Sequence, residues 1–499
     1  MAVSCGRGRG LSVKEGRREL TELDETGVPA VEWADVAFSY PADDPAGGVA
    51  PLGSWGEPVL REASLSVPQG AFCLLSGATG SGKSTLLRLA KPEVAPVGRL
   101  SGSVEVLGRP VGSLSVRQSA CALGLVTQDA SAQLVCDTVG DELAFALENL
   151  SMAPGAIGRR MAEACCFFGI DGWLHTPISE LSGGQRQLAV LAAAMVLRPR
   201  VLLLDEPTAQ LDPVAERAFL HGLFRVNREL GVTVVVATHH AAPMTPYATM
   251  AVEVVAGEVR PVPVDALAEE PSTPCELSLP GEPALVVRDL WARYDARCPW
   301  VLSGCGLEVR SGEVRALVGG NGSGKSTLIK ALAGIVRLRR GKVADAGADR
   351  RGYVPQDPRE VLGSGTVGQE LMAWAPGAGF SEADARAMAV STGLLGLWDR
   401  DAAELSGGQR QLLAVAKVLL CRPRTLLLDE PVKGLDAAAR ATVARLVALA
   451  AREGAAVVVA THDLAYARDC CTTVSMVFDG ALTGTAPASE FFAESVFFS

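Results

Sequence analysis

The chain has no long, uninterrupted apolar run. Its apolar stretches end early, as residues 188–197 do at the triplet Arg198-Pro199-Arg200. A membrane-spanning helix needs about 20 consecutive apolar residues, so no spanning segment is predicted. The first residues, MAVSCGRGRG, are basic, but no apolar core follows them, so no secretory signal is expected. We expect a cytoplasmic protein whose residues 1–28 form a disordered tail.

Positive charge and paired cysteines are also scarce. The chain carries 46 Lys and Arg against 56 Asp and Glu, a formal net charge of −10. Nucleic-acid binding usually requires a basic face, so no nucleic-acid partner is expected. The 12 cysteines include no C-x-x-C pair, which favours buried, reduced thiols over a metal or redox motif.

What the sequence does contain is an internal repeat. Three stretches recur in the same order: GSGKST at 80–85 and 322–327, ELSGGQRQL at 180–188 and 404–412, and LLLDEP at 202–207 and 426–431. A repeat of this length indicates two copies of one domain. We place the copies at 29–262 and 283–499, with a linker rich in Pro, Glu and Ser at 263–282.

Within each copy, short apolar runs alternate with helical patterns. The runs lie at 71–75, 201–204, 232–237, 314–318, 425–428 and 456–460. This alternation is typical of a buried parallel sheet in an α/β domain. The first copy also has a Pro/Gly-rich insert after Tyr40 and extra residues at 91–114, and we interpret both as surface loops.

Two glycine-rich segments carry the clearest chemistry. GATGSGKS at 77–84 and GGNGSGKS at 319–326 fit G-x-x-x-x-G-K-[ST], and each follows an apolar strand and opens a helix. Such a loop wraps backbone N–H groups around phosphate oxygens, while its lysine and hydroxyl serve phosphate and Mg²⁺. The predicted nucleotide-binding residues are Gly77, Gly80, Gly82, Lys83, Ser84 and Thr85 in the first copy, and Gly319, Gly322, Gly324, Lys325, Ser326 and Thr327 in the second.

In each LLLDEP stretch, an aspartate ends the predicted strand and a glutamate follows it. Asp205 and Asp429 are placed to bind Mg²⁺, together with Ser84 and Ser326, and the next residues, Glu206 and Glu430, to polarise the attacking water. Carboxylates at strand ends can also be merely solvated.

Three further residue types recur at matching positions. His239 and His462 are candidate γ-phosphate sensors, although a lone histidine in this setting is more often structural. Gln128 and Gln356 are candidates for a place near Mg²⁺ and the attacking water. Tyr40 and Tyr294 offer rings for stacking on adenine, with core or strand-end packing as the alternative.

The repeated nonamer opens a predicted helix in each copy. A serine cap and free N–H groups at a helix start form an anion site. The residues concerned are Ser182, Gly183, Gly184 and Gln185, and Ser406, Gly407, Gly408 and Gln409. Each copy already holds phosphate on its own loop, so this second anion site makes sense if it faces the nucleotide of the other copy.

Each repeat resembles the ATPase domains of ABC transporters, because it contains in order a phosphate loop, a glutamine, LSGGQ, LLLDEP and Thr-His. The resemblance covers nearly all of both repeats. It implies an α/β fold of two tandem P-loop NTPase domains, each with a parallel-core sheet, an N-terminal antiparallel β subdomain and a helical signature subdomain. It also implies two ATP sites closed head-to-tail, so that the fused halves act as an intramolecular ATPase dimer.

The resemblance also implies which residues share each site. The first phosphate loop, with Gln128, Asp205, Glu206 and His239, would share a site with the second signature. The other loop, with Gln356, Asp429, Glu430 and His462, would face the first signature, and Asp212 and Asp436 match the loop that links the two sites.

The stretch QDASAQLVCDTVGDELAFALENL at 128–150 resembles the ATPases of energy-coupling-factor (ECF) importers, which take up vitamins and transition-metal ions. The resemblance implies a transmembrane scaffold subunit, a separate substrate-binding membrane subunit, and a peripheral location on the cytoplasmic face of the cell membrane. Asp141, Glu142 and Glu370 are candidates to meet arginines of the scaffold. The chain departs from the family pattern at Gln210, His240 and Val432, none of which removes a group that hydrolysis needs.

Other readings of the same motifs stay open. One is the ATPase of a tandem-domain sugar importer, whose second site would be expected to be degenerate. Another is a soluble ABC-F ribosome-associated ATPase, which typically has a long charged helical linker. A DNA-repair ATPase would need a large insertion between Gln128 and Ser182, and the chain has no room for one.

Overall fold

The computed structural model describes residues 27–42, 54–209, 211–268, 275, 280–295 and 297–494. The predicted tail lies almost entirely outside the described residues, as do Gln210 and most of the predicted linker. The start of that linker forms a short 3₁₀ helix, η5 (Val264–Leu267), so it is not structureless throughout. The chain divides into two compact units. The first consists almost entirely of residues before Glu269, and the second consists mainly of the residues from Glu269 onward.

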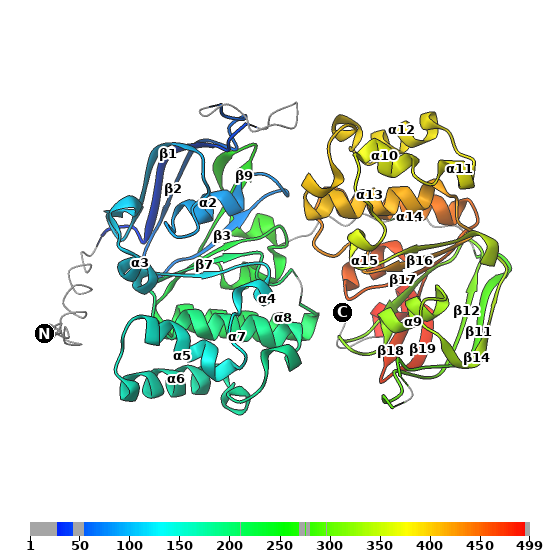
Figure 1. Ribbon diagram of the computed structural model, residues 1–499, viewed down its shortest axis with the longest axis horizontal. Helices are drawn as coiled ribbons and strands as arrows, with labels where there is room; N and C mark the ends of the chain where they lie inside the picture. The colour runs from blue at the N-terminus through cyan, green and yellow to red at the C-terminus, as the bar shows by residue number, and fades with distance from the viewer. Residues whose placement is uncertain are drawn as a thin grey trace, which may run out of the picture. The chain divides into compact units, whose positions relative to one another are not determined.

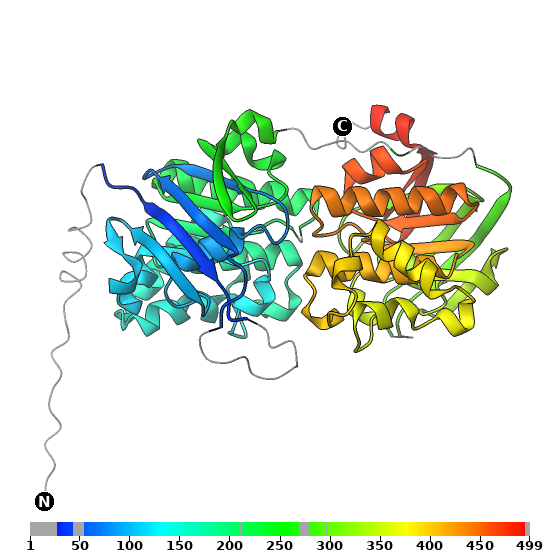
Figure 2. The same ribbon diagram turned by 90° about the horizontal axis from the view of Figure 1, so that it is seen from above.

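The first unit combines two sheets with helices (Figures 1 and 2). An antiparallel sheet has the strand order β2-β1-β4-β5, and the core sheet has the order β10-β9-β3-β8-β7-β6. The strands are β1 (Val31–Ser39), β2 (Leu60–Val67), β3 (Phe72–Ser76), β4 (Arg99–Val106), β5 (Arg109–Pro110), β6 (Leu123–Val126), β7 (Val201–Asp205), β8 (Thr233–Ala237), β9 (Met250–Val255) and β10 (Glu258–Val262). The helices are α2 (Lys83–Leu89), α3 (Val116–Ala122), α4 (Ala130–Gln133), α5 (Val139–Asn149), α6 (Pro154–Phe168), α7 (Gly183–Met195) and α8 (Pro213–Leu230).

The core strands β6, β7, β8, β3 and β9 run parallel to their neighbours, and β10 is antiparallel. Because strands β7 and β8 are buried along their whole length, their sequences are continuous apolar runs. In Figure 1, α7 and α8 cover one face of this sheet, and α2 with the antiparallel sheet covers the other. Helices α5 and α6 pack beyond α7 around their own apolar cluster, which includes Leu143 and Leu147.

The second unit repeats this plan. Its antiparallel sheet has the order β12-β11-β14, and its core sheet has the order β15-β16-β17-β13-β18-β19. The strands are β11 (Pro283–Ala292), β12 (Leu302–Arg310), β13 (Val314–Val318), β14 (Leu338–Asp345), β15 (Arg351–Val354), β16 (Thr425–Asp429), β17 (Ala456–Ala460), β18 (Thr473–Phe478) and β19 (Ala481–Pro487). The helices are α9 (Lys325–Leu332), α10 (Val367–Met372), α11 (Ala375–Ala378), α12 (Glu382–Ser391), α13 (Gly407–Leu420), α14 (Ala437–Arg452), α15 (Leu464–Cys470) and α16 (Ala488–Glu494).

The six predicted core strands and the two-unit α/β fold are confirmed. The interpretation of 91–114 as an extra surface loop is wrong, because strand β4 lies inside it and pairs with β1. The segment reads as a loop because most β4 side chains are exposed, which leaves the apolar alternation weak. Of the loop insert after Tyr40, the structure describes only the two ends, where Pro41 and Trp55 form a β-bridge.

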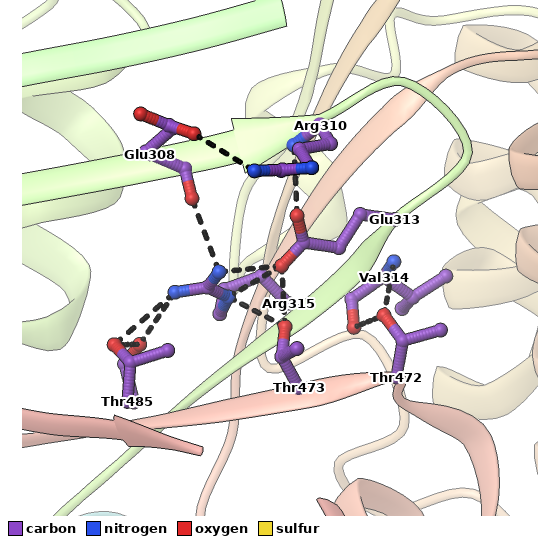
Figure 3. Close-up of polar contacts among 9 residues, drawn as sticks. Glu308, Arg310, Glu313, Val314, Arg315, Thr472, Thr473 and Thr485 are labelled. Carbon is purple, nitrogen blue, oxygen red and sulfur yellow. Dashed lines mark hydrogen bonds and ion pairs between the residues drawn. The ribbon is translucent and has the colours of Figure 1, made fainter. Parts of the chain in front are cut away.

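A buried charge network holds together the strands of the second unit below its phosphate loop (Figure 3). Arg315, on β13, donates to Glu313, to Thr473 and Ser475 on β18, and to Thr485 on β19. Its guanidinium also reaches the backbone oxygen of Glu308 on β12, at 3.0 Å. Arg315 and Glu313 are both buried, and a buried ion pair is tolerated only when its remaining donors and acceptors are satisfied.

The first unit does without this network. Cys73 on β3 occupies the position of Arg315, and Ala71 that of Glu313. Cys73 lies opposite Met250 in the register of β3 and β9, where Arg315 lies opposite Thr473. The equivalent strand pair therefore has apolar side chains at this position in the first unit and a buried ion pair in the second.

None of the helices that the structure describes combines the length and the apolar character needed to cross a bilayer. The cysteines in these ranges are free thiols.

Replacing Arg315 by alanine should destabilise the second unit by about 3 kcal/mol, because Glu313 would be left buried without its cation. The double variant Glu313→Ala, Arg315→Cys, which copies the first unit, should cost much less. Calorimetry of the full chain checks both values. A double variant as unstable as Arg315→Ala would contradict the account.

Candidate functional site

The first phosphate loop connects β3 to α2. Gly77 and Gly82 have φ values of 143° and 109°, in the range that favours glycine. A Cβ at Gly77 would lie 2.5 Å from the backbone oxygen of Val254, so no side chain fits there. Lys83 turns back over the loop and donates to the oxygen of Gly77 at 2.7 Å.

The second phosphate loop, between β13 and α9, has the same geometry. A Cβ at Gly319 would lie 2.3 Å from the oxygen of Val477. Lys325 donates to the oxygens of Gly319 and Gly320 at 2.7 and 3.0 Å. Burial lowers the pKa of Lys325. A buried ammonium whose partners are carbonyl oxygens is well placed to gain from an incoming phosphate.

A serine and an aspartate meet beside each loop. Ser84 donates to Asp205 at 2.8 Å, and Ser326 donates to Asp429 at 2.9 Å. Arg88 lies 3.7 Å from the other oxygen of Asp205, a contact that the motif search missed. Burial raises the pKa of both aspartates above the ordinary value.

These oxygens fit a magnesium ion. Oδ2 of Asp429 is buried and has no hydrogen-bond partner among the described residues. Hydroxyl and carboxylate oxygens are the ligands that Mg²⁺ prefers, and it is usually held by only a few protein groups beside the phosphates.

A glutamate and a histidine side chain lie within hydrogen-bond distance of each other in each unit, just after two adjacent strands of the core sheet. His239 Nδ1 lies 2.9 Å from Glu206, and His462 Nδ1 lies 2.8 Å from Glu430. Both glutamates adopt left-handed backbone conformations, with φ values of 49° and 52°. Non-glycine residues in this region are strained and cluster at functional sites.

Two opposing effects act on Glu430. Burial pushes the pKa of its carboxyl up, but the hydrogen bond and charge of His462, with the charge of Lys325, outweigh it. The pKa of Glu430 is therefore held below its ordinary value, which keeps the carboxylate ionised and able to accept a proton.

The two tyrosines reach back to the phosphate loops. The hydroxyl of Tyr40 is 2.9 Å from Oγ1 of Thr85, and that of Tyr294 is 3.1 Å from Oγ1 of Thr327. Their residues are 38% and 62% exposed, which leaves the rings accessible and argues against the core-packing alternative.

The repeated nonamer opens α7 and α13. Ser182 accepts from the N–H of Gln185, and Gln185 accepts from the N–H of Ser182; Ser406 and Gln409 form the same capping box. The glutamine side chains thus stabilise the helix starts in each unit taken alone. Gly183 and Gly407 have open space around the position of a Cβ.

Gln128 and Gln356 make no hydrogen bond to the other predicted site residues within the described part of the chain. Both are exposed in the loops that follow β6 and β15, and neither side chain has a hydrogen-bond partner in the part of the chain that is described. The sequence analysis missed Gln133, which donates to the oxygen of Leu125 and accepts from the N–H of Thr127. Gln133 therefore fixes the loop that carries Gln128, although nothing but its spacing from Gln128 marked it.

The expectation that Glu142 and Glu370 face a partner protein is wrong. Both residues are buried. Glu142 accepts from the N–H groups of Val135 and Cys136, both at 2.9 Å. Because backbone N–H groups of the preceding loop donate to these carboxylates, their side chains are buried within the unit. Asp141 remains exposed, and its carboxylate accepts from the hydroxyl of Thr138, which caps α5.

Glu370 makes the corresponding contacts in the second unit and one more. It accepts from the N–H of Gly363 at 3.0 Å, and it pairs with Lys417 of α13 at 2.7 Å. Lys417 also donates to the oxygen of Val361 and lies over the ring of Trp374. The loop after Gln356 is thereby tied to the helix that begins at the second signature.

Each unit thus gathers a lysine, a serine, an aspartate, a glutamate and a histidine at the carboxyl ends of its parallel strands, where α/β proteins bind ligands. This arrangement defines a nucleotide-binding P-loop ATPase of two units.

Comparison with known proteins identifies the family. A model of the ABC transporter family matches residues 60–209 and 302–433. A Bacillus thuringiensis subsp. konkukian protein, named provisionally as an ABC transporter ATP-binding protein, is 35% identical over 506 residues, covering 89% of this chain and 91% of the relative. A similarly named Streptomyces avermitilis protein is 34% identical over 517 residues, covering 87% and 92%. The chain belongs to the ABC transporter ATPase family.

A solved structure titled RNase-L Inhibitor has the same fold, with a TM-score of 0.63 over 87% of this chain and 90% of that chain. At 21% identity, this likeness concerns the fold alone.

Replacing His462 by alanine should shift the pH dependence of residual ATP hydrolysis. Without the histidine, burial dominates and the pKa of Glu430 rises. The acidic limb of the pH–rate profile should therefore shift to higher pH by roughly one pH unit or more. The comparison is best made in a Glu206→Gln background, where only the second site contributes. An unshifted limb would contradict the role assigned to Glu430.

Proposed function

We propose that the chain is the ATP-hydrolysing, energy-coupling subunit of an ECF-type importer of vitamins or transition-metal ions. Its partners are a transmembrane scaffold subunit and a substrate-binding membrane subunit. The chain works as a peripheral protein on the cytoplasmic face of the membrane. The ABC ATPase family supports ATP hydrolysis, and the stretch 128–150 supports the importer type.

The observation that carries the proposal is that every group needed for hydrolysis occurs in both units. The phosphate loops bind ATP, with Lys83 and Lys325 on the phosphates. Asp205 and Asp429, with the loop serines, would hold Mg²⁺, which supplies charge neutralisation on the phosphates when bound. Glu206 and Glu430 orient and deprotonate the attacking water, and their histidine partners keep them in place.

The signatures complete the sites from the opposite half. The helices capped by Ser182 and Ser406 present backbone N–H groups to an anion, yet each unit already has a phosphate loop of its own. A head-to-tail pairing gives each signature a γ-phosphate to bind. ATP binding would then close the halves, hydrolysis would reopen them, and the membrane partner would follow this motion.

Single substitutions test whether both sites hydrolyse ATP. Glu206→Gln and Glu430→Gln should each lower the steady-state ATPase rate by about half or more while ATP binding persists, because amides cannot accept the proton of water. If either variant hydrolysed ATP at the wild-type rate, the proposal of two competent sites would be wrong.

A double-mutant cycle tests the head-to-tail pairing. Ser182→Arg should inactivate the site that contains Glu430, so combining it with Glu430→Gln should add little to either loss. Ser406→Arg should act on the other site and add its full loss to that of Glu430→Gln. The reverse pattern would mean that each signature serves its own unit.

Purification of the chain from membranes, followed by mass spectrometry, tests the importer type. A small polytopic scaffold subunit should come with it. Ribosomes in its place would overturn the transport assignment while leaving the ATPase assignment intact.

A further inference from the structure

One face of the antiparallel sheet in the second unit is strongly basic. Along β11, Leu285, Val287 and Leu290 point into the core, and Arg288 and Trp291 lie on the opposite face. We define the basic face as Arg288, Trp291, Arg293, Trp300, Arg340 and Lys342. These residues lie on β11, on β14 and in the segment that joins β11 to β12, and the three strands lie together at one edge of the second unit in Figure 1.

Two cations face each other across this sheet. Arg288 lies directly opposite Lys342 in the register of β11 and β14, and both are exposed. Neither has an acidic partner among the residues that the structure describes. Like charges at directly opposed positions destabilise a sheet, so folding alone gives no reason for this pair.

Tryptophans and arginines continue the face beyond that pair. Trp291 lies opposite Arg340, and the guanidinium of Arg293 stacks 4.4 Å above the ring of Trp300. Trp300 is 44% exposed. The nearby acids are neutralised in part, since Asp289 binds Arg340 at 2.8 Å and Glu308 lies 3.7 Å from Arg310. The face therefore keeps a net positive charge.

The first unit shows that the fold does not require such a face. Its central strand β1 has a positive-φ residue, Asp35, that corresponds to Asp289 of β11. At the two rungs beside it, Ala34 lies opposite Ser103 and Ala37 lies opposite Ser101. Small neutral residues thus occupy the positions held by cations and tryptophan in the second unit.

We propose that the basic face docks the second unit onto the surface of an anionic phospholipid membrane. Each Lys or Arg near such a surface strengthens binding roughly five-fold, and tryptophan favours the boundary between headgroups and acyl chains. The loop that leads into β14 adds Ile335, which is 59% exposed, and the exposed cation Arg337.

The aromatic rings argue against nucleic acid as the partner. Base stacking needs an open ring face. Arg293 covers one face of Trp300, while Trp291 has Arg340 6.0 Å from its centroid and meets Trp300 edge-on at 5.4 Å. Tryptophans stacked with arginines are compatible with a lipid headgroup layer, where cations bind phosphates and aromatic rings lie at the boundary with the acyl chains. The inference does not depend on which solute is transported.

Vesicle flotation of the full chain tests this proposal. The protein should float with phosphatidylcholine vesicles that contain phosphatidylglycerol, and not with pure phosphatidylcholine. The variant Arg288→Ala, Lys342→Ser copies the first unit and should bind on the order of thirty-fold more weakly, since two cations are lost. It should fold at least as well as the wild type, because it removes a like-charge pair, and its ATPase rate should be unchanged.

The control variant Arg386→Ala, Arg400→Ala removes two exposed arginines from the helical part of the same unit and should bind vesicles as the wild type does. No wild-type binding to anionic vesicles, or equal binding by both double variants, would overturn the proposal. Loss of binding to single-stranded RNA in Arg288→Ala, Lys342→Ser, without any vesicle binding, would assign the face to nucleic acid and overturn it as well.

Discussion

One hydrogen bond recurs in each ATP site: a phosphate-loop serine donates to the aspartate at the end of a strand two places away in the core sheet. Ser84 and Asp205 are 121 residues apart, and β8 lies between their strands in the sheet. The bond therefore forms only when the whole parallel sheet is in register. It holds the carboxylate beside the phosphate loop, and the glutamate that follows the aspartate in sequence lies at the end of the same strand.

The two units agree where chemistry constrains them and differ elsewhere. Both phosphate loops need glycine, because a backbone oxygen lies against Gly77 in one and Gly319 in the other. Away from the sites, the second unit has acquired charges that the first lacks. Arg315 joins strands that an apolar pair joins in the first unit, and Lys417 occupies the position of Ala193. Lys417 ties the loop after Gln356 to the signature helix through an ion pair with Glu370. In the first unit, a hydrogen bond from Arg186 of α7 to Ser131 makes the corresponding link.

The parts of the site that could be predicted from sequence are those whose chemistry lies in consecutive residues. A phosphate loop has its glycines, lysine and serine within eight positions, and LLLDEP carries its own strand and acids. The two-unit fold followed for the same reason, because each buried strand is one continuous apolar run.

Features that depend on contacts between distant segments could not be read in this way. The orientation of Glu142 is decided by loop N–H groups that only the folded chain brings to it. Strand β4 was hidden because its exposed side chains give no apolar pattern. The basic face depends on the register of β11 and β14, which places Arg288 opposite Lys342. None of these pairings is visible until the strands are aligned.

The central claim is that neither half hydrolyses ATP efficiently without the other. The most direct test compares ATP turnover by the isolated residues 1–262, kept monomeric, with turnover by the intact chain. The account predicts that the isolated half binds ATP but turns it over at least about ten-fold more slowly, since it lacks the facing signature. Equal turnover by the monomeric half would contradict it.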